Sequence, residues 1–237
     1  MASVRRIRAV VFDLFGTLVP EFPLPVWLGM FEGMAGALGT DAGAFQPAWE
    51  DTVLERQTGG FADVGANLRE ICRRLGRTPS DAQIADALEV RDALYRTWFR
   101  PQPGAVETLG WLRERGYRTA LVSMCAPDAP ALWAASPLGG LVDVLVFSCE
   151  VGLRKPDPAI YLAATDRLGL APAGCLYVGD GSYRELTGAE AVGMTPVRIV
   201  DPAEEAEMLR PDRDDWVGRE IRSLDEVPEV LEGSRAR

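Results

Sequence analysis

Short apolar runs alternate with longer amphipathic segments along most of the chain, and this alternation limits the fold more than any other feature. The apolar runs, rich in β-branched residues, cover residues 7–12, 119–123, 142–148, 175–178 and 196–200. Between these runs lie four segments with helical spacing, at 105–115, 128–135, 158–168 and 183–192. Nearly continuous apolar runs are typical of strands buried on both faces, so the pattern predicts an α/β fold with a doubly wound parallel sheet.

Residues 20–100 interrupt this alternation, because they contain several helical patterns and no strand-like run. Apolar residues at helical spacing predict a first helix here, and they are Trp27, Met30, Phe31, Met34 and Leu38. Further helices are predicted at 41–56, 62–75 and 80–99, and the sequence Pro101-Gln102-Pro103-Gly104 marks the return to the sheet. We therefore expect a core domain of residues 1–19 and 101–237, with a helical domain of residues 20–100 inserted after the first strand. Ligands of open α/β sheets bind at the carboxyl ends of the strands, so this insertion would lie over the site.

Two absences in the composition exclude whole classes of chemistry. The chain has no histidine, and of its 25 basic residues only Lys155 is a lysine. Without histidine there is no Ser-His-Asp or Cys-His nucleophile, no imidazole base and no zinc site that contains histidine. The four cysteines form no C-x-x-C pair, so we expect them to be reduced residues of the core, as fits a cytoplasmic protein; they are Cys72, Cys125, Cys149 and Cys175.

The charge distribution and the hydropathy argue against nucleic acids and membranes as partners. The formal net charge is −10, and residues 201–237 carry twelve acidic and six basic side chains. Proteins that bind nucleic acid need a basic footprint to neutralise phosphates, and none is evident. The apolar run near the N-terminus is interrupted by Asp13, and 18 consecutive apolar residues occur nowhere. We expect a cytoplasmic monomer or homodimer that acts on a small anionic molecule.

Polar residues follow four of the predicted strands at the point where each strand ends. Asp13 follows the first, Ser123 ends the second, Lys155 lies on a loop after the third, and Gly179-Asp180 follows the fourth. Carboxyl ends of parallel strands meet at one edge, so these side chains are expected to lie together. Asp13 stands on a glycine-containing turn that suits a carboxylate nucleophile, and Lys155 provides a compact ammonium charge where the chain otherwise uses arginine.

Acidic residues at this edge point to a metal. Asp180 and Glu185 join Asp13 to give three carboxylates, and ligation by oxygen alone favours Mg²⁺. Each residue also has a purely structural interpretation. Asp13 fits a turn former at a strand end, and Ser123 fits a hydroxyl bonded to its own turn. Asp180 and Glu185 fit acids that stabilise a helix N-terminus, and Lys155 fits a surface lysine.

Taken together, these motifs resemble the haloacid dehalogenase (HAD) superfamily, in the branch with a helical cap inserted after the first motif. Asp13-Leu14-Phe15-Gly16-Thr17-Leu18 resembles motif one, Val122-Ser123 motif two, Lys155-Pro156-Asp157-Pro158 motif three, and Val178-Gly179-Asp180 with Glu185 motif four. The resemblance implies a Rossmann-like core with Asp13, Ser123 and Lys155 as catalytic residues. It implies substrate contacts from Thr17, Ser123, the backbone of Met124 and Lys155, and a Mg²⁺ ion held by Asp13, the backbone carbonyl of Phe15, Asp180 and Glu185.

The sequence departs from the family pattern at Phe15, where phosphatases of the family carry the aspartate that protonates the leaving group. General acid or base assistance contributes about 10²- to 10⁴-fold, so its loss weakens a simple phosphomonoesterase assignment. Haloacid dehalogenases often carry an aromatic residue at this position. They usually have asparagine after the motif-two serine, however, where this chain has Met124, and they lack the Gly179-Asp180 pair. The branch that forms a Schiff base on a cap lysine is excluded, because residues 20–100 contain no lysine.

We therefore expect a Mg²⁺-dependent phosphoryl-transfer enzyme or phosphatase that forms an aspartyl-phosphate on Asp13. A substrate with a good leaving group, or an acid or base from the cap, would compensate for Phe15. Two alternatives remain open, a 2-haloacid dehalogenase that uses Asp13 as its nucleophile and a HAD-fold binding protein with impaired catalysis. Two groups of cap residues also have open roles. Leu24, Trp27 and Phe31 fit either a pocket wall or cap packing, and Arg69, Arg73, Arg74 and Arg77 fit either substrate contacts or a solvated helix face.

Overall fold

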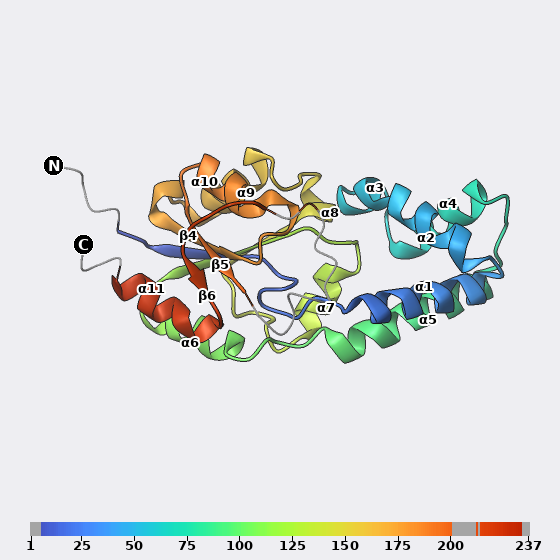
Figure 1. Cartoon of the computed structure of the whole chain (residues 1–237), viewed down its shortest axis with the longest axis horizontal. Coiled ribbons are helices and arrows are strands. Elements are labelled where there is room, and N and C mark those ends of the chain that lie inside the picture. The colour runs from blue at the N-terminus through green and yellow to red at the C-terminus, as the bar shows by residue number, and fades with distance from the viewer. Residues whose placement is uncertain (1–5, 201–211, 213, 234–237) are drawn as a thin grey trace.

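The computed structural model describes residues 6–200, 212 and 214–233, and it contains the predicted parallel sheet (Figure 1). Within these residues, six parallel strands lie in the order β3-β2-β1-β4-β5-β6. Their bounds are β1 Ala9–Phe12, β2 Arg118–Ser123, β3 Val144–Phe147, β4 Cys175–Gly179, β5 Thr195–Ile199 and β6 Glu220–Ile221. The first five correspond to the predicted strands. Strand β6 was not predicted, because two residues are too few to show a period.

Side-chain alternation along β1 divides the core into two layers. Val10 and Phe12 pack with the apolar side chains on one face of the sheet, and Ala9 and Val11 pack with those on the other. All four residues are fully buried. Such burial on both faces is what the nearly continuous apolar run predicted.

Helices cover both faces of the sheet, as a doubly wound fold requires. On the face of Val10 and Phe12 lie α6 (Ala105–Glu114), α7 (Ala129–Ala135) and α11 (Val227–Gly233). On the other face lie α9 (Pro158–Leu168) and α10 (Glu185–Ala191). Shorter turns connect these elements, and they are α8 (Ser148–Val151), η1 (Pro172–Gly174), η2 (Ser182–Arg184) and η3 (Leu224–Glu226).

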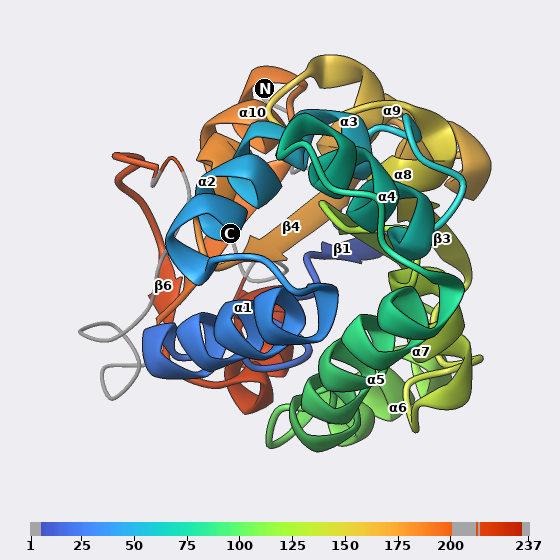
Figure 2. The same cartoon turned by 90° about the vertical axis from the view of Figure 1, so that its right-hand side faces the viewer.

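Five helices from the inserted segment stand beyond the carboxyl ends of the strands (Figures 1 and 2). They are α1 (Leu24–Leu38), α2 (Ala42–Asp51), α3 (Val53–Gln57), α4 (Val64–Arg74) and α5 (Asp81–Trp98). Helices α1 and α5 lie side by side, and the group encloses an apolar core of its own that includes Phe45, Leu68 and Ile71. We call this group the cap.

One predicted cap helix is divided in the structure. The helix predicted at 41–56 is two helices, α2 and α3, separated at Thr52. The Thr52 hydroxyl donates to the carbonyl of Trp49 at 3.0 Å, a local bond that competes with helix continuation. The break turns α3 toward the core, where Gln57 donates a hydrogen bond to the hydroxyl of Tyr183 at 3.0 Å.

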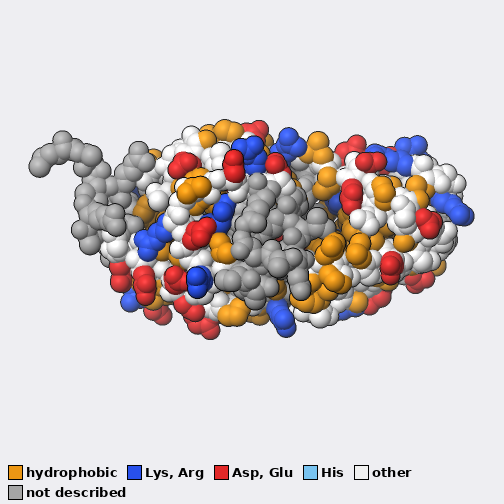
Figure 3. Space-filling model, viewed as in Figure 1, with side chains coloured by type: hydrophobic (Ala, Val, Ile, Leu, Met, Phe, Trp, Pro, Cys, Tyr) orange, Lys and Arg blue, Asp and Glu red, His pale blue; other side chains and the backbone are white. Residues whose placement is uncertain are grey.

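The surface of the molecule shows mixed charge. On the face in Figure 3, acidic and basic side chains are interspersed among hydrophobic ones. Within the described ranges, no helix is both long and apolar enough to cross a membrane. All four cysteines are free. Three of them are buried, and Cys149 is half-buried with its sulfur 3.7 Å from that of Cys125.

An ion pair between a buried arginine and a half-buried aspartate joins the cap to the core. Arg91 of α5 is 2 % exposed and donates to both carboxylate oxygens of Asp128, at 2.6 and 3.2 Å. The same guanidinium donates to the hydroxyl of Tyr95 at 2.9 Å. Removing Arg91 would leave the half-buried carboxylate of Asp128 without its partner and the buried hydroxyl of Tyr95 without its donor.

We expect Arg91→Met to lower the free energy of unfolding by about 3 kcal/mol, because Asp128 loses its partner. The matched control is Arg96→Met on the same helix, whose partner Glu89 is exposed, and there we expect a loss below about 1 kcal/mol. Urea denaturation of the three proteins measures both effects. Equal losses for the two variants would contradict this role of Arg91.

Candidate active site

The carboxyl ends of the strands bring Asp13, Lys155 and Glu185 into direct contact. Asp13 follows β1 at the centre of the sheet, and its backbone N–H donates to the carbonyl of Val178 on β4 at 2.9 Å. The ammonium of Lys155 donates to Asp13 Oδ1 and to Glu185 Oε2, each at 2.5 Å. All three side chains are buried. Lys155 is therefore held between two carboxylates directly beside the predicted nucleophile.

Further donors hold Glu185 in place. Its Oε2 also accepts from the hydroxyl of Tyr177 at 2.7 Å, and its Oε1 accepts from the backbone N–H of Gly181 at 3.0 Å. Glu185 is the first residue of α10, where a carboxylate also meets the positive end of the helix dipole. Both of its oxygens are thus engaged by groups of the protein.

Burial and like charge shape the ionisation of this cluster. Burial, reinforced by the nearby Asp13 carboxylate, raises the pKa of Glu185 to about 8. The pKa of Asp13 is also raised, by burial against the opposing effect of Lys155. Burial alone would lower the pKa of Lys155, but the two carboxylates outweigh it and raise the value. The acids therefore resist ionisation beside a single ammonium, and a bound cation would favour their charged forms.

The donor set fits a metal that prefers oxygen. Asp13, Asp180 and Glu185 each place one carboxylate oxygen within 4.8 Å of the others. Asp180 is fixed by Ser182, whose backbone N–H and hydroxyl donate to its two oxygens at 2.9 and 2.8 Å. Gly16, at φ +75°, lets the turn after Asp13 approach closely, since a Cβ there would lie 2.9 Å from Asp180 Oδ2.

Two buried hydroxyls at the same edge have no hydrogen-bond partner among the described residues. They belong to Thr17, in the turn after Asp13, and to Ser123, at the end of β2, and both residues are fully buried. A buried hydroxyl without a partner costs about 1–3 kcal/mol, so such groups are uncommon in folded proteins. The two hydroxyls are suited to bind oxygen atoms of a ligand.

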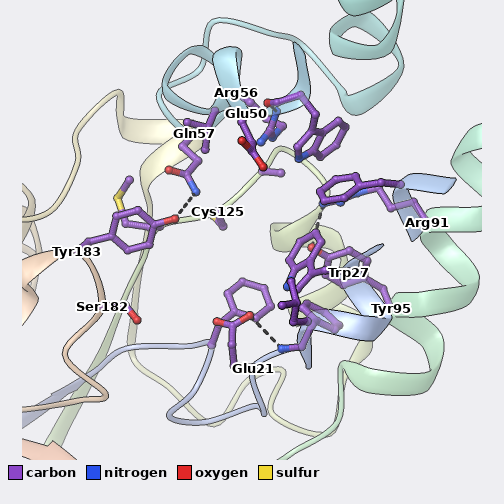
Figure 4. A pocket seen from close by; sticks show the side chains of 18 of the residues that line it. Glu21, Trp27, Glu50, Arg56, Gln57, Arg91, Tyr95, Cys125, Ser182 and Tyr183 are labelled. Atoms are coloured by element: carbon purple, nitrogen blue, oxygen red, sulfur yellow. Dashed lines mark hydrogen bonds between the residues drawn. The ribbon is translucent and has the colours of Figure 1, made fainter. Parts of the chain in front are cut away.

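A pocket of about 390 Å³ lies between the core and the cap (Figure 4), and Asp13 is one of the residues that line it. Met124 and Tyr183 line it from the core, and Leu24, Trp27 and Phe31 line it from the cap. The latter three therefore form a pocket wall, one of the two roles that the sequence left open for them. Trp27 and Phe31 also contribute to the apolar packing of the cap.

Phe15 places an aromatic ring in this pocket. The ring is half-buried and packs against Phe22, Tyr95 and Phe99, with centroid distances of 6.0, 6.5 and 5.9 Å. Because a phenyl ring carries no ionisable proton, position 15 offers apolar contact in place of acid or base assistance.

The cap arginines singled out in the sequence lie on the surface. Arg73 and Arg74 pair with Glu70 at 2.7 Å, and Arg69 pairs with Asp81 at 2.5 Å. None of the four lines the pocket. Among the described residues, the arginines that do line it are Arg56 and Arg91, and neither was predicted as a site residue.

Several other pocket and site residues were also missed. Tyr183 and Arg184 have positive φ angles of 56° and 52°, an uncommon conformation for residues other than glycine, and Tyr183 reaches the pocket from this turn. No sequence signal marks such a turn. Tyr177 did carry a signal, since it places a hydroxyl in an otherwise apolar run that directly precedes Gly179-Asp180.

Comparisons with known proteins identify the family of this chain. A family model described as haloacid dehalogenase-like hydrolase matches residues 7–193. A glyceraldehyde 3-phosphate phosphatase from Methanopyrus kandleri is 29 % identical over 81 % of this chain and 84 % of its own length. An (S)-2-haloacid dehalogenase 4A from Burkholderia cepacia is 30 % identical over 83 % and 84 %. In fold, the chain resembles a HAD phosphatase from Thermococcus onnurineus, with a TM-score of 0.67 over 96 % of this chain and 99 % of that one, at 24 % identity.

The family model spans most of the chain, including all four strand ends that carry the site, and both relatives cover more than four fifths of it. The chain belongs to the haloacid dehalogenase-like hydrolases and is a hydrolase of the HAD superfamily.

Proposed function

We propose that this hydrolase is a Mg²⁺-dependent phosphatase that forms an aspartyl-phosphate on Asp13. The observation that carries the proposal is the pair of unpartnered buried hydroxyls, Thr17 and Ser123, beside a carboxylate in contact with a buried ammonium. A phosphoryl group has several oxygens to accept hydrogen bonds and carries negative charge. It would satisfy both hydroxyls and place its phosphorus next to Asp13.

In the proposed reaction, an Asp13 oxygen attacks phosphorus in line and the bond to the leaving oxygen breaks. Lys155 neutralises charge on the phosphoryl oxygens, while Ser123, Thr17 and the backbone of Met124 orient them. Water then attacks the aspartyl-phosphate, which releases inorganic phosphate and restores the carboxylate. Phosphoryl transfer depends mostly on positioning and charge stabilisation, and the buried cluster is suited to supply both.

Asp13, Asp180 and the backbone carbonyl of Phe15 would hold the Mg²⁺ ion, with Glu185 beside them. When bound, the ion would stabilise negative charge on the transferring group. Glu185 already accepts hydrogen bonds from three donors, Lys155, Tyr177 and Gly181. We therefore propose that the main role of Glu185 is to position Lys155, and that binding the metal is its secondary role.

Glu21 is a half-buried acid that lies in the same pocket as Asp13. Its Oε1 accepts from the backbone N–H of Phe22 at 3.0 Å, so its own turn fixes the carboxylate (Figure 4). Burial, reinforced by Asp180 and Asp13, raises its pKa to about 8. Among the residues of the inserted segment, Glu21 best fits the base that compensates for Phe15, and we assign it to activating the water that attacks the aspartyl-phosphate.

A dehalogenase is the second candidate, favoured by the apolar ring of Phe15 in the pocket and by the similarity to the (S)-2-haloacid dehalogenase 4A. It would use the same Asp13 on carbon instead of phosphorus. The dehalogenase function would be supported if the protein released halide from 2-chloropropionate without metal and showed no phosphatase activity. A HAD-fold binding protein with impaired catalysis would hydrolyse neither class of substrate and would show no thermal shift with beryllium fluoride and Mg²⁺.

We expect the wild-type protein to hydrolyse acetyl phosphate only when Mg²⁺ is present, and Asp13→Asn to lower the rate by at least about 10³-fold, because an amide is a poor nucleophile. Acid-quenched mass spectrometry should find a phosphoryl adduct on a peptide that contains Asp13. The control is Asp157→Asn, which alters an exposed helix cap outside the pocket. Equal rates with EDTA and with Mg²⁺ would overturn the proposed metal dependence.

We expect Phe15→Asp to raise kcat for alkyl phosphomonoesters by about 10²-fold, since it adds a carboxyl group beside the nucleophile. Phe15→Leu removes the ring without adding an acid and is the matched control. Steady-state phosphate release measures all three proteins. If the aspartate and leucine variants behave alike, proton transfer at position 15 is not what limits this enzyme.

Glu21 should make stability depend on pH. Its pKa is about 8 in the folded protein and near the ordinary value of 4.5 in the unfolded chain, so the unfolded state holds fewer protons between these values. The free energy of unfolding therefore falls as the pH rises from about 5 to 8. We expect Glu21→Gln to remove this loss. Between pH 5 and pH 8, the free energy of unfolding of the variant should rise by at least about 1 kcal/mol relative to that of the wild type. Exposed Glu50→Gln is the control for denaturation at both pH values, and a gain from Glu21→Gln that does not grow with pH would contradict the prediction.

A further inference from the structure

The walls of the pocket are aromatic on both the cap and the core side. Trp27, Phe31, Trp49 and Tyr95 line it from the cap, and Phe15 and Tyr183 line it from the core. Trp27 and Phe31 stack at a centroid distance of 5.7 Å with 25° between their planes, and Phe31 lies 6.1 Å from Trp49. Figure 4 shows Trp27, Tyr95 and Tyr183 around the space above Glu21. Aromatic walls favour a flat aromatic ligand by stacking and edge-to-face contact.

Among the residues that the structure describes, two cations line the pocket, and both are already engaged. Arg91 pairs with Asp128. Arg56 lies over the ring of Trp49 at 3.9 Å and donates through Nη1 to three oxygens within the cap, those of Trp49, Thr52 and Asn67, at 3.0–3.1 Å. The carboxyl groups of Glu21 and Glu50 line the same space. The pocket is therefore better suited to an uncharged group than to a second acidic group on the substrate.

The volume of the pocket sets the size of that group. A dry apolar cavity of about 150 Å³ is sufficient to bind benzene. A pocket of about 390 Å³ thus accommodates one substituted ring or two fused rings attached to a phosphoryl group. Short polar substrates, such as phosphorylated two- or three-carbon acids and aldehydes, would leave most of the aromatic wall without contact.

The ring of Phe15 favours a leaving group that needs little help from an acid. A phenol has a pKa of about 10, as for the tyrosine side chain, whereas water has a value of about 15.7. A phenolate therefore departs from phosphorus far more readily than an alkoxide. An aromatic alcohol thus satisfies the shape of the pocket and the chemistry at position 15 at the same time.

We infer that the substrates of this enzyme are aryl phosphates, phosphomonoesters of aromatic alcohols, with the ring seated between Phe15 and the wall formed by Trp27 and Phe31. The inference rests on the proposed phosphatase function of Asp13. Asp13 forms the new bond to phosphorus, the bond from phosphorus to the aryl oxygen breaks, and the phenolate keeps the electron pair and takes a proton from water. Hydrolysis of the aspartyl-phosphate then completes the cycle.

The test compares kcat/KM, with Mg²⁺ present, for phenyl and 1-naphthyl phosphate, for benzyl phosphate, and for 2-phosphoglycolate and glyceraldehyde 3-phosphate. Acetyl phosphate, which has no ring, is the reference for the chemistry at Asp13. We expect the two aryl phosphates to exceed both non-aromatic esters by at least about tenfold, since each aromatic contact contributes about 0.5–1.5 kcal/mol. Benzyl phosphate has the ring but an alkoxide leaving group, so it should share the KM of phenyl phosphate and have a lower kcat.

A pair of tryptophan variants separates ring binding from general damage. Trp27→Ala should lower the ratio of kcat/KM for phenyl phosphate to that for acetyl phosphate by about tenfold. Trp98→Ala is the matched control, because Trp98 is also half-buried in the cap but does not line the pocket. It should leave the ratio unchanged. Because the ratio is taken within one variant, a partial loss of folded protein cancels.

The possible failures are distinguishable. If acetyl phosphate is hydrolysed but the non-aromatic esters match or exceed the aryl phosphates, the substrate class is wrong and the phosphatase function stands. The same conclusion follows if Trp27→Ala and Trp98→Ala change the ratio equally. If neither acetyl phosphate nor any of the phosphate esters is hydrolysed and no adduct forms on Asp13, the proposed function itself fails.

Discussion

The buried ammonium of Lys155, held between Asp13 and Glu185, is the interaction on which the rest of the site depends. Without this charge, the two carboxylates would face each other in the interior at a high electrostatic cost. The surrounding backbone is built to permit the contact. A Cβ on Gly179 would lie 2.2 Å from Glu185 Oε1, so only glycine allows α10 to begin this close to the end of β4. The contact therefore depends on four parts of the chain together: the end of β4, Gly179, the first residue of α10 and the loop that carries Lys155.

Much of the core and part of the site could be predicted from the sequence, because their signals are local. A buried parallel strand is a continuous apolar run, and an amphipathic helix has its own period. Parallel strands place their carboxyl ends at one edge whatever the details of packing. Asp13 and Lys155, at or after different strand ends, could therefore be assigned to one cluster from their positions along the chain. The scarcity of lysine was a further signal, independent of any pattern.

The pocket could not be predicted, because contacts between distant segments create it. Arg91 is 37 residues from Asp128, and Gln57 is 126 residues from Tyr183, yet these pairs join the cap to the core. Tyr183 depends on a left-handed turn in which neither residue is glycine, so local preferences point away from the observed conformation. Local rules often fail where function is located. Thr17 and Ser123 likewise look ordinary in sequence, and only their burial without partners sets them apart.

The single lysine of this chain also makes the site directly observable. Protein grown with nitrogen-15 lysine would contain one labelled side chain, and that side chain would be the ammonium in contact with Asp13. Its NMR signal would report ligand binding, metal binding and covalent change at the nucleophile without substitution of any residue. The chain has no histidine and no lysine in residues 20–100. The same composition gives the protein a single lysine that can serve as a spectroscopic probe of the site.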